Sequence, residues 1–154
     1  MKLINLGSHT PQDGLNVRFR PSFIDHVLEG LAFLPVLANW IYILYRYRLS
    51  GGDLPSDLYL SGGTVLFLFI LLGAAGYCPV RFINFPFRVG PHNLIFQYLL
   101  ALRLCRVLNI ILSTQFLFAS LSTYHAWANV GFAVCVVLLL VAFAVYMVLA
   151  YRKR

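Results

Sequence analysis

The stretch Pro79–Asn109, PVRFINFPFRVGPHNLIFQYLLALRLCRVLN, decides the fold, because a basic segment rich in proline leads there into a long apolar helix. Pro91 suits the first turn of that helix, where its missing N–H has no partner to lose. The pattern stays helical from Leu94 to Ser122, and at 1.5 Å per residue this predicts a helix about 43 Å long. The hydrocarbon core is roughly 30 Å thick, so we expect the first two turns to lie among the lipid headgroups.

The composition is that of an integral membrane protein. Of the 154 residues, 60% are hydrophobic and 11% are charged, and the mean hydropathy is +0.79. Soluble domains have about 45–50% apolar and about 25% charged residues. A membrane-spanning helix needs about 20 apolar residues, so four crossings use nearly the whole chain and leave no room for a soluble catalytic domain.

The apolar runs divide the chain into four predicted helices, and we expect one domain, residues 1–154, with an all-α, integral membrane four-helix bundle fold. The turn between the last two runs is very short, which predicts an antiparallel hairpin. Ser22 and Asp25 have the spacing of a capping box, which predicts a helix start near Ser22. The predicted membrane helices are 27–45, 58–77, 97–120 and 126–150, and residues 1–20 form a polar arm without the apolar run of a signal peptide.

The distribution of lysine and arginine predicts the orientation in the membrane. Loops on the cytoplasmic side carry an excess of these residues. With a cytoplasmic N-terminus, Arg46 and Arg48 are the loop cations on the outer side. We therefore expect both termini in the cytoplasm. The cations on the inner side are then Lys2, Arg18, Arg20, Arg81, Arg88, Arg152, Lys153 and Arg154.

A polar stripe on the third predicted helix is the main candidate site. Arg103 and Arg106 are three residues apart, and Asn109 continues the same face. The first interpretation is that both guanidinium groups reach lipid phosphates near the interface. The second is an ion pair with Asp25 or Glu29, which are four residues apart on the first helix at the same level. The third is binding of an anionic ligand or of a partner's carboxylate.

Further basic and aromatic residues flank the apolar runs and are predicted to anchor the protein at the lipid interface. The formal charge of +7 favours attraction to anionic lipid headgroups over nucleic acid, because the arginines flank apolar segments instead of forming a solvated patch. The predicted anchors are Arg81, Arg88, Tyr151, Arg152, Lys153 and Arg154.

No motif for metal binding or catalysis is present in the sequence. The four histidines are scattered and the three cysteines lack C-x-x-C spacing, so no metal ion and no cofactor is predicted. No serine or cysteine nucleophile has a recognisable partner, and no glycine-rich phosphate loop occurs. The one carboxylate pair is Asp25 and Glu29. We therefore expect no enzymatic activity.

The segment Phe82–Asn109 resembles the region after the second membrane helix in the bacterial membrane proteins grouped as domain of unknown function 1648. That family has a short loop with proline, a helix start like Pro-Glu-Asn, a Gln-Tyr pair and spaced arginines. His92 stands here where an acidic residue is usual. The matching positions are Asn84, Pro86, Pro91, Asn93, Gln97, Tyr98, Arg103, Arg106, Leu108 and Asn109.

The resemblance is general elsewhere in the chain. Between the first two helices the family has a Leu-Pro segment, then Ile-Pro-x-His-Phe-Asn and a glycine. Leu54, Pro55 and Gly62 echo this pattern, but the His-Phe-Asn core is absent. The resemblance extends distantly to bacteriocin-immunity membrane proteins. It implies a bacterial inner-membrane protein that acts in immunity, sensing or signalling through protein contact and not through catalysis.

Together, these patterns predict a non-enzymatic multi-pass membrane protein that binds another membrane component, with anionic lipids and either a protein partner or a second copy of the chain as partners. The alternative is a small transporter or channel subunit in which the polar stripe lines a path through an oligomer. The direction in which Arg103, Arg106 and Asn109 face discriminates between the two.

Overall fold

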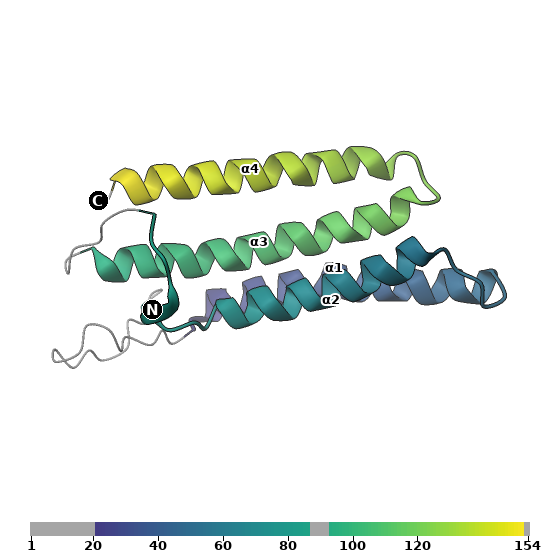
Figure 1. The fold of residues 1–154 in the computed structure, drawn as a ribbon, viewed down its shortest axis with the longest axis horizontal. Helices are drawn as coiled ribbons and strands as arrows, with labels where there is room; N and C mark the ends of the chain where they lie inside the picture. Colours follow the sequence, from purple (N-terminus) through teal and green to yellow (C-terminus); the bar gives the residue numbers. More distant parts are fainter. Residues whose placement is uncertain (1–20, 87–92, 153–154) are drawn as a thin grey trace.

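The computed structural model describes residues 21–86 and 93–152. This part of the chain is helical and contains no strand (Figure 1). Four of its helices are long and apolar enough to cross a membrane, which confirms the predicted all-α class of a multi-pass membrane protein. The elements are α1 (Phe23–Leu49), α2 (Ser56–Ala75), the short 3-10 helix η1 (Val80–Phe82), α3 (Leu94–Ser122) and α4 (Ala128–Arg152).

Helices α1 and α3 extend beyond the predicted spans 27–45 and 97–120 at both ends, whereas α2 ends at Ala75, before the predicted 77, and α4 begins at Ala128, after the predicted 126. The differences arise because capping groups and turns set the helix ends, and hydropathy marks only the apolar part. At the start of α1 the predicted capping box is present, and the Asp25 carboxylate accepts a hydrogen bond of 2.7 Å from the Ser22 backbone N–H. Beyond the end of α1, Gly51 and Gly52 have φ values of 67° and 98°, which favour glycine. These two residues turn the chain back towards α2.

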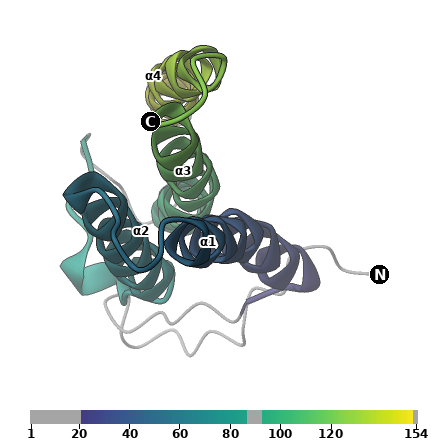
Figure 2. The same cartoon turned by 90° about the vertical axis from the view of Figure 1, so that its right-hand side faces the viewer.

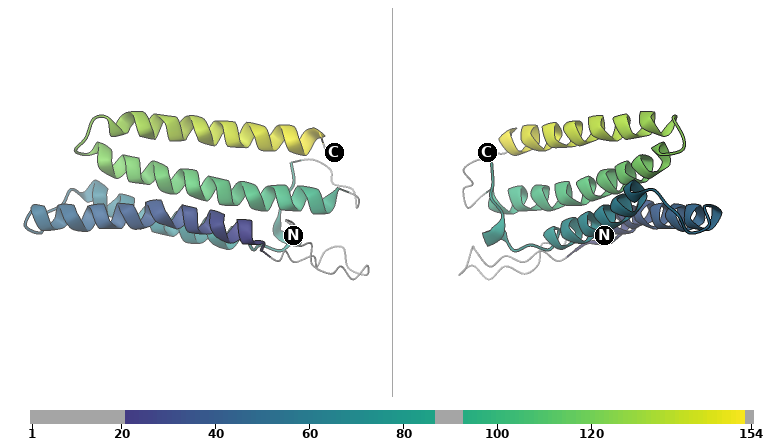
Figure 3. Two further views of the ribbon diagram at one scale, coloured as in Figure 1. Left: turned by 180° about the vertical axis from the view of Figure 1, so that it is seen from behind. Right: turned by 45° about the vertical axis from the view of Figure 1, so that its right-hand side comes forward.

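Helix α3 is the centre of the arrangement. Helices α1 and α2 pack on one side of α3, and α4 packs along its other side (Figure 2). Helix α4 lies apart from α1 and α2 in both views of Figure 3. Below, the terminal end is the end of the bundle where α1 begins and α4 ends, and the hairpin end is the end with the connections 50–55 and 123–127. Since α1 and α3 both begin at the terminal end, they run parallel.

Polar side chains are buried inside this bundle together with apolar ones, and many large apolar side chains are exposed on its outside. Lipid tails are as apolar as leucine, so helix association in a membrane depends on close packing and interhelical hydrogen bonds. The hydroxyl groups of Ser61 in α2 and Ser120 in α3 are 2.8 Å apart. The Gln97 side-chain amide in α3 donates to the Ala150 carbonyl in α4, also at 2.8 Å. These bonds fix the vertical register of α2 and α4 against α3.

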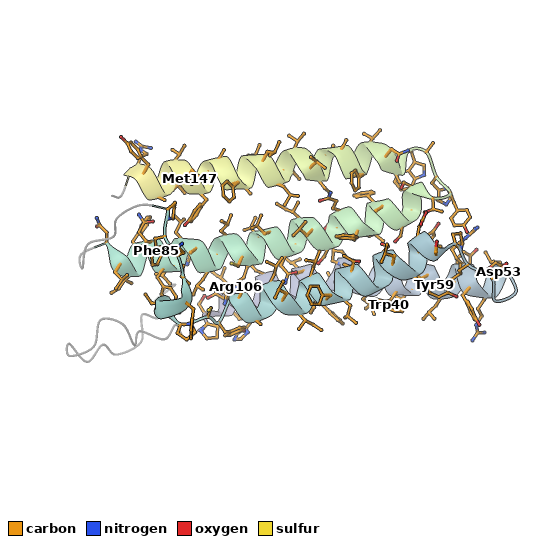
Figure 4. The ribbon with its side chains drawn as sticks, viewed as in Figure 1. Trp40, Asp53, Tyr59, Phe85, Arg106 and Met147 are labelled. Carbon is orange, nitrogen blue, oxygen red and sulfur yellow. The ribbon has the colours of Figure 1, made fainter. Side chains whose placement is uncertain are left out.

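The connection between α2 and α3 packs on α3. Val80 is buried against Tyr98 and Leu102 of α3, and Ile83 and Phe85 pack against the same cluster (Figure 4). The Tyr98 hydroxyl donates a hydrogen bond of 2.9 Å to the Cys78 carbonyl at the start of the connection. The first part of the basic segment is therefore ordered and packs against the start of α3.

A glycine allows α3 and α4 to approach closely near the hairpin end. A Cβ atom added to Gly131 in α4 would lie 2.5 Å from two ring carbons of Phe118 in α3. The Phe118 ring in turn meets the Trp127 ring edge-on, with centroids 6.3 Å apart. Because Trp127 restrains it, the Phe118 ring has little freedom to move away from a larger side chain at position 131.

We predict that Gly131→Ala lowers the midpoint of thermal unfolding in mild detergent. Overpacking costs about 1–3 kcal/mol, which outweighs the gain of about 1 kcal/mol in helix propensity. The matched control is Gly63→Ala in α2, where an added Cβ has no neighbour within 4 Å. The control is expected to leave the midpoint unchanged or raise it. Equal shifts for both variants would contradict the close approach at Gly131.

Candidate functional site

A buried charged cluster joins α1 to α3 near the terminal end. Nη1 of Arg106 lies 3.2 Å from Oδ1 of Asp25, and Nε of Arg106 lies 3.3 Å from Oε1 of Glu29. Asp25 is fully buried and Arg106 is 3% exposed. Figure 4 shows Arg106 between α3 and the α1–α2 pair. Of the three interpretations of the arginines, the interhelical ion pair describes the surroundings of Arg106.

The ends of two helices support this cluster. Asp25 lies in the first turn of α1, where the positive end of the helix dipole favours a carboxylate. Nη2 of Arg106 lies 3.4 Å from the carbonyl oxygen of Gly76, at the C-terminal end of α2, where the dipole favours a cation. A single guanidinium group therefore connects α1, α2 and α3.

Two further side chains surround Glu29 on the more exposed side of the cluster. The Tyr77 hydroxyl lies 2.8 Å from both carboxylate oxygens of Glu29 and donates to them. Nδ1 of His26 lies 3.6 Å from Oε2 of Glu29. Desolvation raises the pKa of Tyr77, and the Glu29 carboxylate raises it further, so the phenol stays protonated as a donor. The cluster contains one carboxylate more than its guanidinium group balances, and these donors stabilise the excess charge.

Arg103 has different surroundings, although it is only three residues from Arg106. It is partly buried and lines a groove of about 230 Å³ between α3 and α4. Three residues correspond to 300° around a helix, so the two side chains diverge by about 60°. Arg106 consequently points towards α1 and α2, and Arg103 points towards α4. The two arginines of the predicted stripe therefore lie in different environments.

The walls of this groove are apolar. They include Leu104 and Val107 of α3 and Ala142 and Val145 of α4, and the Tyr146 ring forms another part of the surface. In the described part of the chain Arg103 has no ion pair with a carboxylate. The groove is therefore an almost wholly apolar surface, and Arg103 is the one charged residue beside it.

Asn109, the third residue of the predicted stripe, faces α2. Its side-chain amide donates a hydrogen bond of 3.3 Å to the carbonyl oxygen of Phe69. Asn109 is 3% exposed and lies within the bundle. The predicted stripe is thus divided among three neighbours, with Arg106 on α1 and α2, Asn109 on α2 and Arg103 at the groove beside α4.

The predicted interface anchors are only partly within the described residues. Tyr151 and Arg152 form the exposed end of α4 and belong to the helix itself. Arg88, Lys153 and Arg154 lie outside the described residues, as does the side chain of Arg81.

The hairpin end has a second, polar hollow of about 490 Å³ between α2 and α3, lined by Asp57, Ser61, Thr64 and Ser122 among others. Nearby, the Arg46 guanidinium lies 3.5 Å from the centroid of the Tyr124 ring, a cation–π contact between the end of α1 and the α3–α4 turn. Arg46, predicted as an outer loop cation, therefore also ties the two hairpins together.

Several residues of the site do not follow from the sequence pattern. Tyr77 and the Gly76 carbonyl become part of the charged cluster only because the end of α2 reaches the level of Arg106. Gln97 and Tyr98 could have been found from the sequence, because they are polar residues near the arginines in an otherwise apolar run. An isolated polar group in such a run indicates an interhelical hydrogen bond.

Comparisons with known proteins do not assign this site, because no family model, no curated protein and no solved structure matches the chain.

We predict that Arg106→Gln destabilises the protein by about 3–5 kcal/mol, because it leaves the buried Asp25 carboxylate without its cation. Asp25→Asn is expected to cost less, because Arg106 keeps its contact with Glu29. The double variant is expected to lose less than the sum of the two single losses. Chemical unfolding in mild detergent, arranged as a double-mutant cycle, measures this difference. Arg103→Gln is the control and is expected to change stability little. Additive losses would mean that Arg106 and Asp25 do not interact.

Proposed function

We propose that this chain is a non-enzymatic, multi-pass protein of the bacterial inner membrane that binds another membrane component, and that the groove between α3 and α4 is its binding surface. The observation that carries this proposal is that Arg103, which has no carboxylate partner among the described residues, lines an almost wholly apolar groove with the aliphatic part of its side chain. An intramembrane ionisable residue of this kind indicates a functional site.

The packing of the helices also supports this proposal. The cluster at Arg106 joins α1, α2 and α3 into one unit, whereas α4 is attached along α3. The two flanks of α4 beside its contact with α3 are therefore accessible to other molecules within the plane of the membrane. Binding sites between the helices of bundles are common in proteins.

The directions of the polar side chains favour binding over the alternative of a transporter or channel subunit. Arg106 is occupied by Asp25 and Glu29, and Asn109 by the carbonyl of Phe69. These residues contribute to contacts between helices, and a path for a solute needs polar groups that face a common water-filled space. The immunity, sensing or signalling role implied by the family resemblance is consistent with a protein that recognises a membrane-embedded partner.

We predict that a photoreactive phenylalanine derivative at Val145 captures a specific membrane component in cells. Val145 lines the groove, while Val148 lies one turn away on α4 and does not, and the two side chains are 51% and 56% exposed. Position 148 is therefore a control matched in depth and exposure. Mass spectrometry of the purified chain is expected to show an adduct of defined mass from position 145 alone. Identical adducts at both positions, or none at either, would contradict binding in the groove.

We also predict that both termini lie in the cytoplasm, because the loop cations of the inner side outnumber those of the outer side. Green fluorescent protein fused to the C-terminus is expected to fluoresce, and alkaline phosphatase fused there is expected to be inactive. The control is a phosphatase inserted between Gly51 and Gly52, in the loop between α1 and α2, which is expected to be active. An active C-terminal phosphatase would reverse the orientation.

A further inference from the structure

The groove between α3 and α4 has the chemical character of a site for an amphiphile. Its walls are almost wholly apolar, and Arg103, its one charged residue, contributes mainly the aliphatic part of its side chain to them. At about 230 Å³ the groove is below the roughly 300–1,000 Å³ of sites that enclose drug-sized ligands. Part of one extended hydrocarbon chain suits this volume.

The depth of Arg103 places its charge within reach of the lipid headgroups. Arg103 is nine residues after Leu94, so its Cα lies about 14 Å along α3 from the terminal end. Since α3 exceeds the roughly 30 Å hydrocarbon core by about 13 Å, this position is close to the edge of the core if the excess lies at the terminal end. Side chains in a helix tilt towards its N-terminus, so the tilt directs Arg103 towards that same edge.

The register of α4 brings the groove to the same edge of the membrane. The bond from Gln97 to the Ala150 carbonyl aligns the start of α3 with the end of α4. Leu149 in the groove is three residues from Arg152, the basic residue at the exposed end of α4. The groove therefore begins near the headgroups and continues into the hydrocarbon, with Arg103 at its side.

We infer that the α3–α4 groove binds one anionic phospholipid, with the phosphate on Arg103 and one acyl chain along the apolar walls. This inference rests on the proposed function and names the membrane component that the groove binds. An anionic lipid matches the groove better than a zwitterionic one because its charge is not balanced within its own headgroup, so the attraction to a single guanidinium is larger. A charge-assisted bond to the phosphate oxygens supplies the directional part of the recognition.

Native mass spectrometry of the purified chain in mild detergent, titrated with phosphatidylglycerol or phosphatidylcholine, tests this inference. The unsubstituted protein is expected to retain one phosphatidylglycerol in preference to phosphatidylcholine. Arg103→Gln is expected to weaken this retention about tenfold or more, in line with the loss of a hydrogen bond to a charged group. Arg103→Lys is expected to preserve part of the retention because the charge remains.

Two further variants separate the groove from general attraction to a basic surface. Arg48→Gln removes an exposed cation from the hairpin end of α1, at the opposite end of the bundle, and is expected to leave the preference for phosphatidylglycerol unchanged. Ala142→Phe fills the groove while Arg103 keeps its charge, and it is expected to abolish the retained lipid. Circular dichroism and size-exclusion chromatography check that each variant is folded, and a folded Arg103→Gln variant that retains lipid as well as the unsubstituted protein would overturn the inference.

The lipid measurement and the photocapture at Val145 have distinguishable failures. If position 145 captures a protein and phosphatidylglycerol is not preferred, the proposed binding function stands and the lipid inference is wrong. If position 145 captures nothing and no lipid is retained, both are wrong. Capture of a lipid at 145 together with loss of retention in Arg103→Gln supports both.

Discussion

The contact of Arg106 with Asp25 and Glu29 is the interaction on which the rest of the structure depends. Its guanidinium group also reaches the Gly76 carbonyl, so one side chain sets the level of α1 and α2 against α3. A buried ion pair adds little net stability, because the desolvation of both charges offsets their attraction. It nevertheless penalises every arrangement in which one charge loses its partner. The cluster therefore selects the register of α1 against α3 more than it strengthens their packing.

The helix count was predictable from the sequence, because a long apolar run has few stable structures other than a membrane helix. The pairing of Arg106 was one of several open alternatives, since Asp25 and Glu29 were expected at the same level of the membrane. The neighbouring helix that each of Arg103 and Arg106 faces was not predictable. It depends on the rotation of α3 relative to its neighbours, and hydropathy carries no information on rotation when a helix is apolar around most of its circumference.

The segment between α2 and α3 illustrates the same limit. Its prolines and arginines predict a loop at the interface, but they do not reveal that Val80 packs on Tyr98 and Leu102. Tertiary packing of a few apolar side chains decides this contact. Gln97 and Tyr98 both make interelement hydrogen bonds, which join α3 to α4 and to the connection.

The two arginines of α3 have different capacities for binding because their charges are desolvated to different extents. Arg106 is enclosed by two carboxylates, and a ligand that displaced them would leave both without their cation. Such an exchange is unfavourable in a medium of low dielectric. Arg103 is only partly buried and lies beside an apolar groove. An anion that binds there is attracted to the guanidinium and does not have to displace a protein carboxylate among the described residues. The same helix therefore combines a structural arginine with one that is suited to a ligand, and the direction of each side chain decides which is which.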